Sequence, residues 1–286
     1  MIIFDFNQVA ISNLMEQIGS SKTAVDESLV RHMILNTIRT YVKKFKESHG
    51  PEVVIACDNK KYWRRDVFPN YKSNRKKARD ASGLDWNLLF ESLNKIRDEI
   101  RDNFPYKVLR IDRCEADDVI AAICHKYGRF LGDDEKILIL SGDKDFAQLQ
   151  KYSNVSQYSP VQKKMIAINN PESFRKEHIM LGDRSDGIPN FISDDDSFVK
   201  NKRQKPLRRE KIAEWIHMEP EQFCSGEMLR GYKRNEMLID LDKIPDHIQN
   251  QCIEQFESVP CNNRSKIFNY FIQNRLSSLT ESISDF

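Results

Sequence analysis

Short apolar runs alternate with helical patterns through the first half of the chain. The apolar runs are IIFDFN (2–7), EVVIACDN (52–59), YKVLRID (106–112) and EKILILSGD (135–143), and we predict that each forms a strand. Apolar residues recur at intervals of three and four over 26–47, 85–103 and 115–127, which predicts helices there. Such alternation is typical of an α/β fold, with a mostly parallel central sheet covered by helices on both faces.

The second half of the chain has a different pattern. Residues 154–169 read as a hairpin appended to the sheet, with SPVQ (159–162) as its turn, and from Pro171 onward only short helices with Pro and Gly breaks are predicted. We therefore predict an α/β domain over 1–185 and a smaller all-helical domain over 186–286. The acidic stretch SDDDS (193–197) and the basic residues after it are expected to form an exposed connection.

Composition indicates the class of protein and its compartment but not its function. The 286 residues are 40% hydrophobic and 31% charged, with a formal net charge of only +2, so overall charge does not indicate a nucleic-acid binder. The six cysteines form no CxxC pair, which favours buried thiols in a reducing compartment. No apolar run approaches the roughly 18 residues that span a bilayer, so we expect a soluble, intracellular protein.

Acidic residues follow every predicted strand of the parallel sheet. Asp5 lies within the first strand, Asp58 ends the second, Glu115 and Asp117 follow the third, and Asp143 and Asp145 follow the fourth. Asp183 and Asp186 come later, in the turn LGDRSDGIP. Each acid alone could be a helix cap or a turn residue. Asp5 is expected to have neither a turn nor a cap to explain it, and four strands out of four argue for a shared site at the carboxyl edge of the sheet.

So many carboxylates in one place require cations to neutralise them. Oxygen ligands favour Mg²⁺ or Mn²⁺ over zinc, and none of the six histidines lies beside these acids in sequence. Two such ions are typical of hydrolysis of a phosphodiester by water. The sequence has no Gly-x4-Gly-Lys-Ser/Thr loop, which argues against an NTPase.

A basic, aromatic segment follows Asp58 directly. Residues 60–79 hold nine Lys or Arg against one acid, interleaved with Tyr62, Trp63, Phe68 and Tyr71. This mixture of phosphate-binding charge and stacking surface is typical of a nucleic-acid site, although a solvated charged loop is the alternative. A second basic run, KNKRQKPLRREK (200–211), suits contact with a duplex backbone or, equally, a disordered loop.

Several stretches together resemble the flap endonuclease and 5′-nuclease superfamily, most closely its T-even bacteriophage ribonuclease H branch. They are IIFDFNQVAIS, RHMILNTIRTYVKK, CDNKKYWRRD, YKSNRKKAR, EADDVIA, ILSGDKDFAQLQKY, SQYSP, GDRSDGIP and SSLTESISDF. The resemblance implies a Mg²⁺-dependent 5′→3′ exonuclease and flap endonuclease with two ions, for which Mn²⁺ can substitute. Its substrates would be RNA–DNA primers, nicked duplexes and 5′ flaps in phage DNA replication, in the cytoplasm of the host cell.

The resemblance also assigns roles to residues. The implied metal ligands are Asp5, Asp58, Glu115, Asp117, Asp143, Asp145, Asp183 and Asp186. Asp5, Asp58, Asp117 and Asp143 would lie nearest the scissile phosphate, and Asp145, Asp183 and Asp186 would hold the more distant ion. Arg64 and Lys72, with Asp117 and Asp143, are the implied catalytic residues. Arg64, Arg65, Tyr71, Lys72 and Arg75 would bind substrate in a basic arch over about 59–84. Asp118 and Lys144 receive no role.

The resemblance has one gap and leaves two alternatives. After GDRSDGIP the chain lacks the Gly-x-Gly turn with which cellular relatives bind potassium and duplex DNA, so a phage-type duplex-binding element is expected. Implied partners are single-strand DNA-binding protein and sliding clamp, and the protein would be a monomer. The alternatives are a PIN-type single-strand ribonuclease and a non-catalytic, structure-specific DNA-binding protein.

Overall fold

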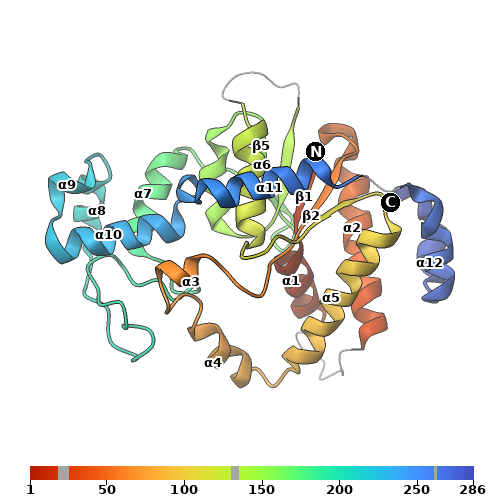
Figure 1. Cartoon of the computed structure of the whole chain (residues 1–286), viewed down its shortest axis with the longest axis horizontal. Helices are drawn as coiled ribbons and strands as arrows, with labels where there is room; N and C mark the ends of the chain where they lie inside the picture. The colour runs from red at the N-terminus through yellow and green to blue at the C-terminus, as the bar shows by residue number, and fades with distance from the viewer. Residues whose placement is uncertain (19–25, 130–134, 261–262) are drawn as a thin grey trace.

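A six-stranded sheet forms the centre of the computed structural model, which describes residues 1–18, 26–129, 135–260 and 263–286 (Figure 1). The strands are β1 (Ile2–Asp5), β2 (Val53–Ala56), β3 (Lys107–Leu109), β4 (Ile137–Leu140), β5 (Val155–Ser159) and β6 (Lys164–Ile166). Their spatial order is β3-β2-β1-β4-β5-β6, and every neighbouring pair is parallel except β5 and β6. The mostly parallel sheet and the appended hairpin are thereby confirmed.

The strands are shorter than the sequence predicts, and helix α1 was not predicted. Phe6 and Asn7 belong to α1 (Phe6–Ile18), which follows β1 without a loop. Because no Gly or Pro separates the two elements, the apolar run gives no sign of the junction. Asp5 stands at that junction, and its Oδ1 accepts a hydrogen bond from the Gln8 backbone nitrogen at 3.3 Å. The prediction that Asp5 has no capping role was therefore wrong.

Helices cover both faces of the sheet, as predicted. One face is covered by α1, α2 (Glu27–His49), α5 (Trp86–Asn103) and, from the other end of the chain, α12 (Ile267–Gln273) and α13 (Ser277–Thr280). The opposite face is covered by α6 (Ala116–Tyr127), the 3-10 helix η1 (Lys144–Lys151) and α11 (Asp246–Ser258). The burial of these two apolar faces fixes where the carboxyl ends of the strands meet.

The remaining helices lie between and beside these layers. The predicted arch contains α3 (Arg64–Val67) and α4 (Asn74–Ala81), and the chain passes from α3 through α4 to α5 along one side of the molecule (Figure 1). A third apolar cluster joins α3 to α7 (Pro171–Leu181), α8 (Arg209–Trp215), α9 (Pro220–Phe223) and α10 (Gly226–Ile239). Short 3-10 helices lie at Leu241–Lys243, Arg264–Lys266 and Ile283–Asp285. A division of the chain near residue 185 stays a prediction.

The acidic stretch at 193–197 was predicted to be exposed, but much of it packs against other parts of the chain. Ser193 and Ser197 are buried, and Asp195 pairs with Arg230 and Arg234 of α10. Asp196 pairs with Lys200 and Lys202 of the following basic run. The two charge runs therefore neutralise each other in part, which charge counting along the sequence could not show.

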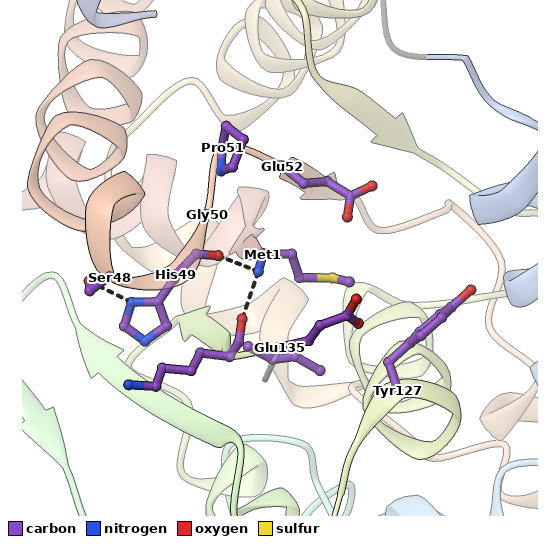
Figure 2. A pocket seen from close by; sticks show the side chains of 10 residues that line it. Met1, Ser48, His49, Gly50, Pro51, Glu52, Tyr127 and Glu135 are labelled. Carbon is purple, nitrogen blue, oxygen red and sulfur yellow. Dashed lines mark hydrogen bonds between the residues drawn. The ribbon is translucent and has the colours of Figure 1, made fainter. Parts of the chain in front are cut away.

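A cavity of about 320 Å³ lies away from the acids, next to the amino ends of β1 and β4 (Figure 2). Its wall includes Met1, His49 and Tyr127, and none of the eight predicted ligands is among the described residues that line it. Five of the six cysteines are buried and unpaired, as expected, and Cys261 lies outside the described residues. No helix in the described part of the chain is long and apolar enough to cross a membrane.

Candidate active site

A cavity of about 670 Å³ opens at the carboxyl edge of the sheet. Its wall includes Asp5, Asp58, Asp117 and Asp143, one acid from or after each of the four predicted strands. The same cavity is lined by side chains from the arch and from α5, namely Tyr62, Arg65, Lys72, Arg75, Arg79, Trp86 and Phe90. The structure therefore brings the four acids that were predicted to lie nearest the phosphate into one place.

Hydrogen bonds hold three of the four acids, Asp5, Asp58 and Asp143. Asp5, which is only 5% exposed, accepts a hydrogen bond from Ser141 Oγ at 2.9 Å. Asp58 accepts one from Asn7 Nδ2 and one from the Ala116 backbone nitrogen, both at 2.9 Å. Asp143 caps η1 by accepting from the Asp145 backbone nitrogen at 3.0 Å. All three of these residues line the cavity.

Burial and mutual repulsion disfavour the ionised form of the acids in this cavity. Burial, with the charges of Asp58 and Asp143, raises the pKa of Asp5 to about 7. Burial and the neighbouring Asp143 raise the pKa of Asp117 well above its usual range. Burial also raises the pKa of Asp143. Acids that repel one another in this way fit a site that cations complete.

Glu115 is held differently, because basic residues of the arch surround it. Its carboxylate contacts Lys72 Nζ, and accepts hydrogen bonds from Arg64 Nη1 and from Tyr71 Oη, both at 3.0 Å. Burial by itself raises the pKa of Glu115, but the charges of Lys72 and Arg64 outweigh it and lower that pKa. Glu115 therefore joins the arch to the sheet edge as an ion-paired carboxylate.

Lys72 reaches Glu115 because of an unusual backbone conformation. Its φ is 56°, in the left-handed region that a residue with a side chain seldom adopts. Its backbone nitrogen donates to the Asp186 carbonyl at 2.7 Å, and its Nζ lies 3.5 Å from Asp186 Oδ2. Arg75 pairs with the same carboxylate. The arch and the GDRSDGIP turn are thus tied together at the wall of the cavity.

Arg64 lies behind the acids rather than on the cavity wall. The residue is 2% exposed, and its Nη1 donates to Asp118 Oδ1 at 2.8 Å while its Nε donates to the Leu238 carbonyl at 3.0 Å. Asp118, to which the sequence assigned no role, also accepts from Trp63 Nε1 at 3.1 Å. The predicted contact of Arg64 with a phosphate stays a prediction, and the geometry favours a positioning role.

The aromatic residues of the arch are mostly buried. Trp63, Phe68 and Tyr71 pack inside, so the interpretation of these three side chains as stacking surface was wrong. A role of Tyr71 in binding substrate stays a prediction. Removing their apolar surface from water stabilises the fold. The spacing of aromatic residues along a basic segment does not reveal which of them are buried. The aromatic side chains that line the cavity are Tyr62 and, from α5, Trp86 and Phe90. Lys76 is exposed, outside that wall.

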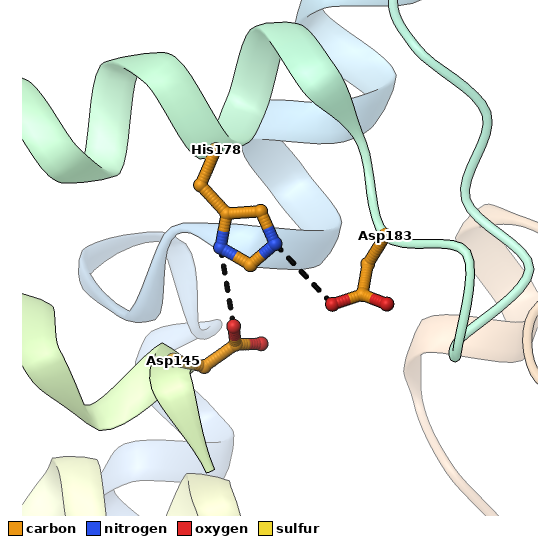
Figure 3. A group of neighbouring side chains, drawn as sticks. All are labelled: Asp145, His178 and Asp183. Atoms are coloured by element: carbon orange, nitrogen blue, oxygen red, sulfur yellow. Dashed lines mark hydrogen bonds and ion pairs between the residues drawn. The ribbon is translucent and has the colours of Figure 1, made fainter.

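A second group of acids lies beside the first, and here the sequence missed two residues. His178 of α7 lies between Asp145 and Asp183, with Nδ1 3.1 Å from Asp145 Oδ1 and Nε2 3.3 Å from Asp183 Oδ2 (Figure 3). Lys144 Nζ lies 2.9 Å from Asp183 Oδ2, a contact that the sequence did not predict. His178 precedes Asp183 by five residues, and this short separation at a helix end is the one signal the sequence offered.

The pKa values of the two acids of this group shift in opposite directions. Burial and the neighbouring Asp143 raise the pKa of Asp145 to about 7. Burial also acts to raise the pKa of Asp183, but its contacts with His178, Ser185 and Lys144 outweigh this and hold that pKa well below the usual range. Donor atoms of Asp145, His178 and Asp183 lie within 4.8 Å of one another, close enough to hold a metal ion.

The turn that carries Asp183 depends on glycine. Gly182 has a φ of 70°, and a Cβ at this position would lie 2.4 Å from the Ile188 carbonyl oxygen. Asp183 and Ile188 pair across the turn through two backbone hydrogen bonds of 2.7 and 2.8 Å. The tight turn delivers Asp183 to His178 and Asp186 to Lys72 and Arg75.

Comparison with known proteins gives the family. Residues 13–179 match the profile of the 5′–3′ exonuclease N-terminal resolvase-like domain, and residues 171–286 match that of the T4 RNase H C-terminal region. The chain is 38% identical to ribonuclease H of Enterobacteria phage T4, over 99% of this chain and 95% of that protein. It is 32% identical to a 5′–3′ exonuclease of Buchnera aphidicola, over 54% of this chain and 53% of that protein.

The solved structures agree on the fold. A phage T5 flap endonuclease crystallised with DNA and metal ions superposes with a TM-score of 0.58 at 18% identity, covering 90% of this chain and 99% of that one. The T5 5′-exonuclease with bound zinc gives 0.58 at 17% identity, covering 90% and 98%. Together with the two profiles and the T4 relative, these findings place the protein: the chain belongs to the 5′–3′ exonuclease family of structure-specific 5′ nucleases.

Proposed function

We propose that this protein is a Mg²⁺-dependent 5′→3′ exonuclease and flap endonuclease that hydrolyses phosphodiesters by in-line attack of water. The observation that supports the proposal is the shared cavity, in which Asp5, Asp58, Asp117 and Asp143 face the arch side chains Lys72, Arg65 and Arg75. Acids alone would suit many cation sites. Acids facing phosphate-binding cations across one cavity suit a phosphodiester held against metal ions.

The residues present fit two hard divalent cations. The donor set is carboxylate oxygen, which favours Mg²⁺ or Mn²⁺. Burial and neighbouring acids raise the pKa values of Asp5 and Asp117, which supports a site that cations complete. Asp5, Asp58, Asp117 and Asp143 would hold one ion, and Asp145 would hold the other, with Asp183 and Asp186 beside it. When bound, the ions supply an activated water and stabilise charge on the phosphate.

The chain's own side chains would orient the strand. Lys72 would place its ammonium beside the phosphate and stabilise negative charge there, while Arg65 and Arg75 would contact neighbouring phosphates. Tyr62, Trp86 and Phe90 line the same cavity and would stack against bases. Arg64 and Tyr71 would act indirectly, since both hold Glu115 and its arch contacts in place. The attacking water would form the new bond to phosphorus while the bond between phosphorus and the 3′-oxygen breaks. The water would lose a proton to solvent, and the 3′-oxygen would take up a proton from solvent and leave as a hydroxyl.

The substrates follow from the relatives. One relative is named ribonuclease H and a structural neighbour is a flap endonuclease in complex with DNA. We therefore infer that RNA–DNA primers, nicked duplexes and 5′ flaps are cleaved during phage DNA replication in the host cytoplasm. A monomeric enzyme with a single-strand DNA-binding protein and a sliding clamp as partners is part of the same proposal.

A labelled flap substrate tests the proposal. We expect Mg²⁺-dependent release of 5′ fragments from a 5′-labelled flap duplex, and none with EDTA. Asp143→Asn is expected to abolish cleavage while retaining DNA binding, because it removes a carboxylate that faces the ions. Asp102→Asn, at an exposed acid of α5, is the matched control and should cleave normally.

Other results would replace the proposal. Full activity of Asp143→Asn would contradict the assignment of the ions. Cleavage confined to single-stranded RNA would indicate a PIN-type ribonuclease. A shift of the flap duplex without cleavage in any divalent metal would indicate a DNA-binding protein.

A further inference from the structure

His178 is a buried imidazole between two acids, and each of its nitrogens faces a different one. The residue is 5% exposed and projects from α7 toward Asp145 on one side and Asp183 on the other (Figure 3). A buried polar side chain normally has a hydrogen-bond partner for every polar atom. His178 departs from this rule on one side only.

Asp183 is fully occupied by protein donors. Its Oδ1 accepts hydrogen bonds from the Ser185 backbone nitrogen at 2.7 Å and from Ser185 Oγ at 2.6 Å. Its Oδ2 faces Lys144 Nζ at 2.9 Å and His178 Nε2 at 3.3 Å. The Asp186 backbone nitrogen also donates to Oδ1, at 3.3 Å. A carboxylate with three donors on one oxygen and two on the other has little capacity left for a metal ion.

On the opposite side of the imidazole, the facing atoms lack hydrogen-bond donors and acceptors from the described part of the chain. His178 Nδ1 and Asp145 Oδ1 are both buried, and neither has a hydrogen-bond partner among the described residues, although they lie 3.1 Å apart. Two adjacent ligands of an octahedral ion, each at about 2.1 Å, are about 3 Å apart. The unpartnered pair therefore has the separation that a shared cation requires.

We propose that His178 is a metal ligand: its Nδ1 and Asp145 Oδ1 bind the second ion directly, and Asp183 is a positioning residue that accepts a hydrogen bond from Nε2–H. A carboxylate that holds the far nitrogen of a ligating histidine is a recurrent arrangement in metal sites. It fixes the tautomer whose Nδ1 lone pair faces the ion. The inference rests on the proposed function only in taking Asp145 as part of the ion site.

An imidazole changes which metal this position takes. Nitrogen ligands favour Mn²⁺, Co²⁺ and Zn²⁺ relative to Mg²⁺, whereas a site of oxygen atoms alone favours the hard ions. The position beside His178 should therefore bind a transition metal in preference to Mg²⁺. The acids Asp5, Asp58 and Asp117 form a site of oxygen atoms and lack this preference.

Pulsed electron paramagnetic resonance on the Mn²⁺-loaded wild-type protein tests the ligand directly. We expect a nitrogen hyperfine coupling from bound Mn²⁺ that changes to the ¹⁵N pattern when only the histidines carry ¹⁵N. The absence of a histidine coupling, with Mn²⁺ bound, would overturn the inference. This measurement needs neither a variant nor turnover.

Metal titrations of variants give the second readout. His178→Asn should weaken Mn²⁺ binding at one site by at least about tenfold and leave Mg²⁺ binding within about threefold, since removal of even an outer contact typically costs 10–100-fold. Asp183→Asn should weaken the same Mn²⁺ site while the histidine coupling persists. His217→Asn, at an exposed histidine, is the matched control. An equal loss of Mg²⁺ and Mn²⁺ binding in His178→Asn would mean that His178 only positions acids.

The two proposals can fail separately. A histidine coupling in a protein that cleaves no flap in any metal would support the ligand and contradict the proposed function. Flap cleavage in a protein without the coupling would do the opposite.

Discussion

At the residue scale, Lys72 has a backbone conformation that local sequence preference does not explain. A left-handed lysine is strained, and such strain persists only where surrounding contacts fix it. The contacts here are the Glu115 carboxylate and the Asp186 backbone and side chain. The ammonium is therefore already in place at the cavity wall before any substrate arrives.

Lys72→Ala should slow the chemical step much more than it weakens binding. A preorganised charge that stabilises the developing phosphate charge is typically worth about 100- to 1,000-fold in rate. Single-turnover cleavage of a 5′ flap should fall by about this factor, and the dissociation constant should change only about threefold. Lys76→Ala, in the exposed part of the arch, is the control. A loss of affinity without a slower step would make Lys72 a backbone contact only.

Asp5→Asn should stabilise the metal-free protein at high pH. Folding raises the pKa of Asp5 to about 7, from an unfolded value near 4. Between these two pH values the folded protein therefore becomes less stable as the pH rises, because ionising Asp5 is less favourable in the folded state. The cost is absent at low pH, where the group is protonated in both states. In EDTA at pH 8 the variant should gain about 1–3 kcal/mol in the free energy of unfolding, and at pH 4 almost nothing.

Urea denaturation in EDTA at both pH values measures this difference. The same substitution should abolish cleavage, because it removes a ligand, so stability and activity move in opposite directions at pH 8. A variant that is less stable than wild type at pH 8 would contradict the account of Asp5 as an uncompensated buried acid.

At the element scale, Arg64 connects three parts of the chain. Its guanidinium joins α3 to the start of α6 through Glu115 and Asp118, and to α10 through the Leu238 carbonyl. Removing one partner of a buried ion pair leaves the other charges uncompensated.

Arg64→Ala should therefore destabilise the fold by about 3–5 kcal/mol and reduce cleavage without changing a phosphate contact. The neighbouring Arg65 is exposed and lines the cavity, so Arg65→Ala should weaken substrate binding with little change in stability. Thermal unfolding and binding of a flap duplex separate the two effects. If Arg64→Ala weakened DNA binding while unfolding at the wild-type temperature, the direct phosphate contact implied by the family resemblance would be correct.

Elements were predicted from sequence where one periodicity dominates. Buried strands are uniformly apolar, and apolar residues recur every three to four positions along an amphipathic helix. These two patterns identified strands β1, β2, β3 and β4 and helices α2, α5 and α6. Helix α1 was missed because its pattern continues directly from β1. The meeting of Asp5, Asp58, Asp117 and Asp143 was predictable, since parallel strands end at one edge.

The contacts between distant segments could not be predicted in this way. His178 reaches Asp145 only because α7 packs against η1, and Arg64 reaches Leu238 only because α3 packs against α10. Nothing in the spacing of a helical histidine or of an arginine in a basic run specifies such a partner. These are the positions at which the structure changes the interpretation of the site.

At the scale of the whole molecule, the acids at the carboxyl edge of the sheet destabilise the metal-free fold, and bound cations should remove this effect. Burial raises the pKa of Asp5, Asp117, Asp143 and Asp145, so in metal-free protein at neutral pH these groups either hold protons or repel one another. The sheet edge, the arch and the GDRSDGIP turn all contribute to this cavity and its neighbourhood. Binding of divalent metal should therefore stabilise the fold as a unit.

We expect Mg²⁺ or Mn²⁺ at saturating concentration to raise the melting temperature of the wild-type protein by several degrees, because a ligand at 100 times its dissociation constant adds about 2.7 kcal/mol per site. The gain should be larger at pH 8 than at pH 6, since the metal must displace the protons that Asp5 and Asp145 hold with pKa values of about 7. Differential scanning calorimetry with EDTA, Mg²⁺ and Mn²⁺ measures it. Asp143→Asn should lose most of the gain, while Asp102→Asn should keep it. An equal rise for both variants would place the stabilising ions elsewhere on the molecule.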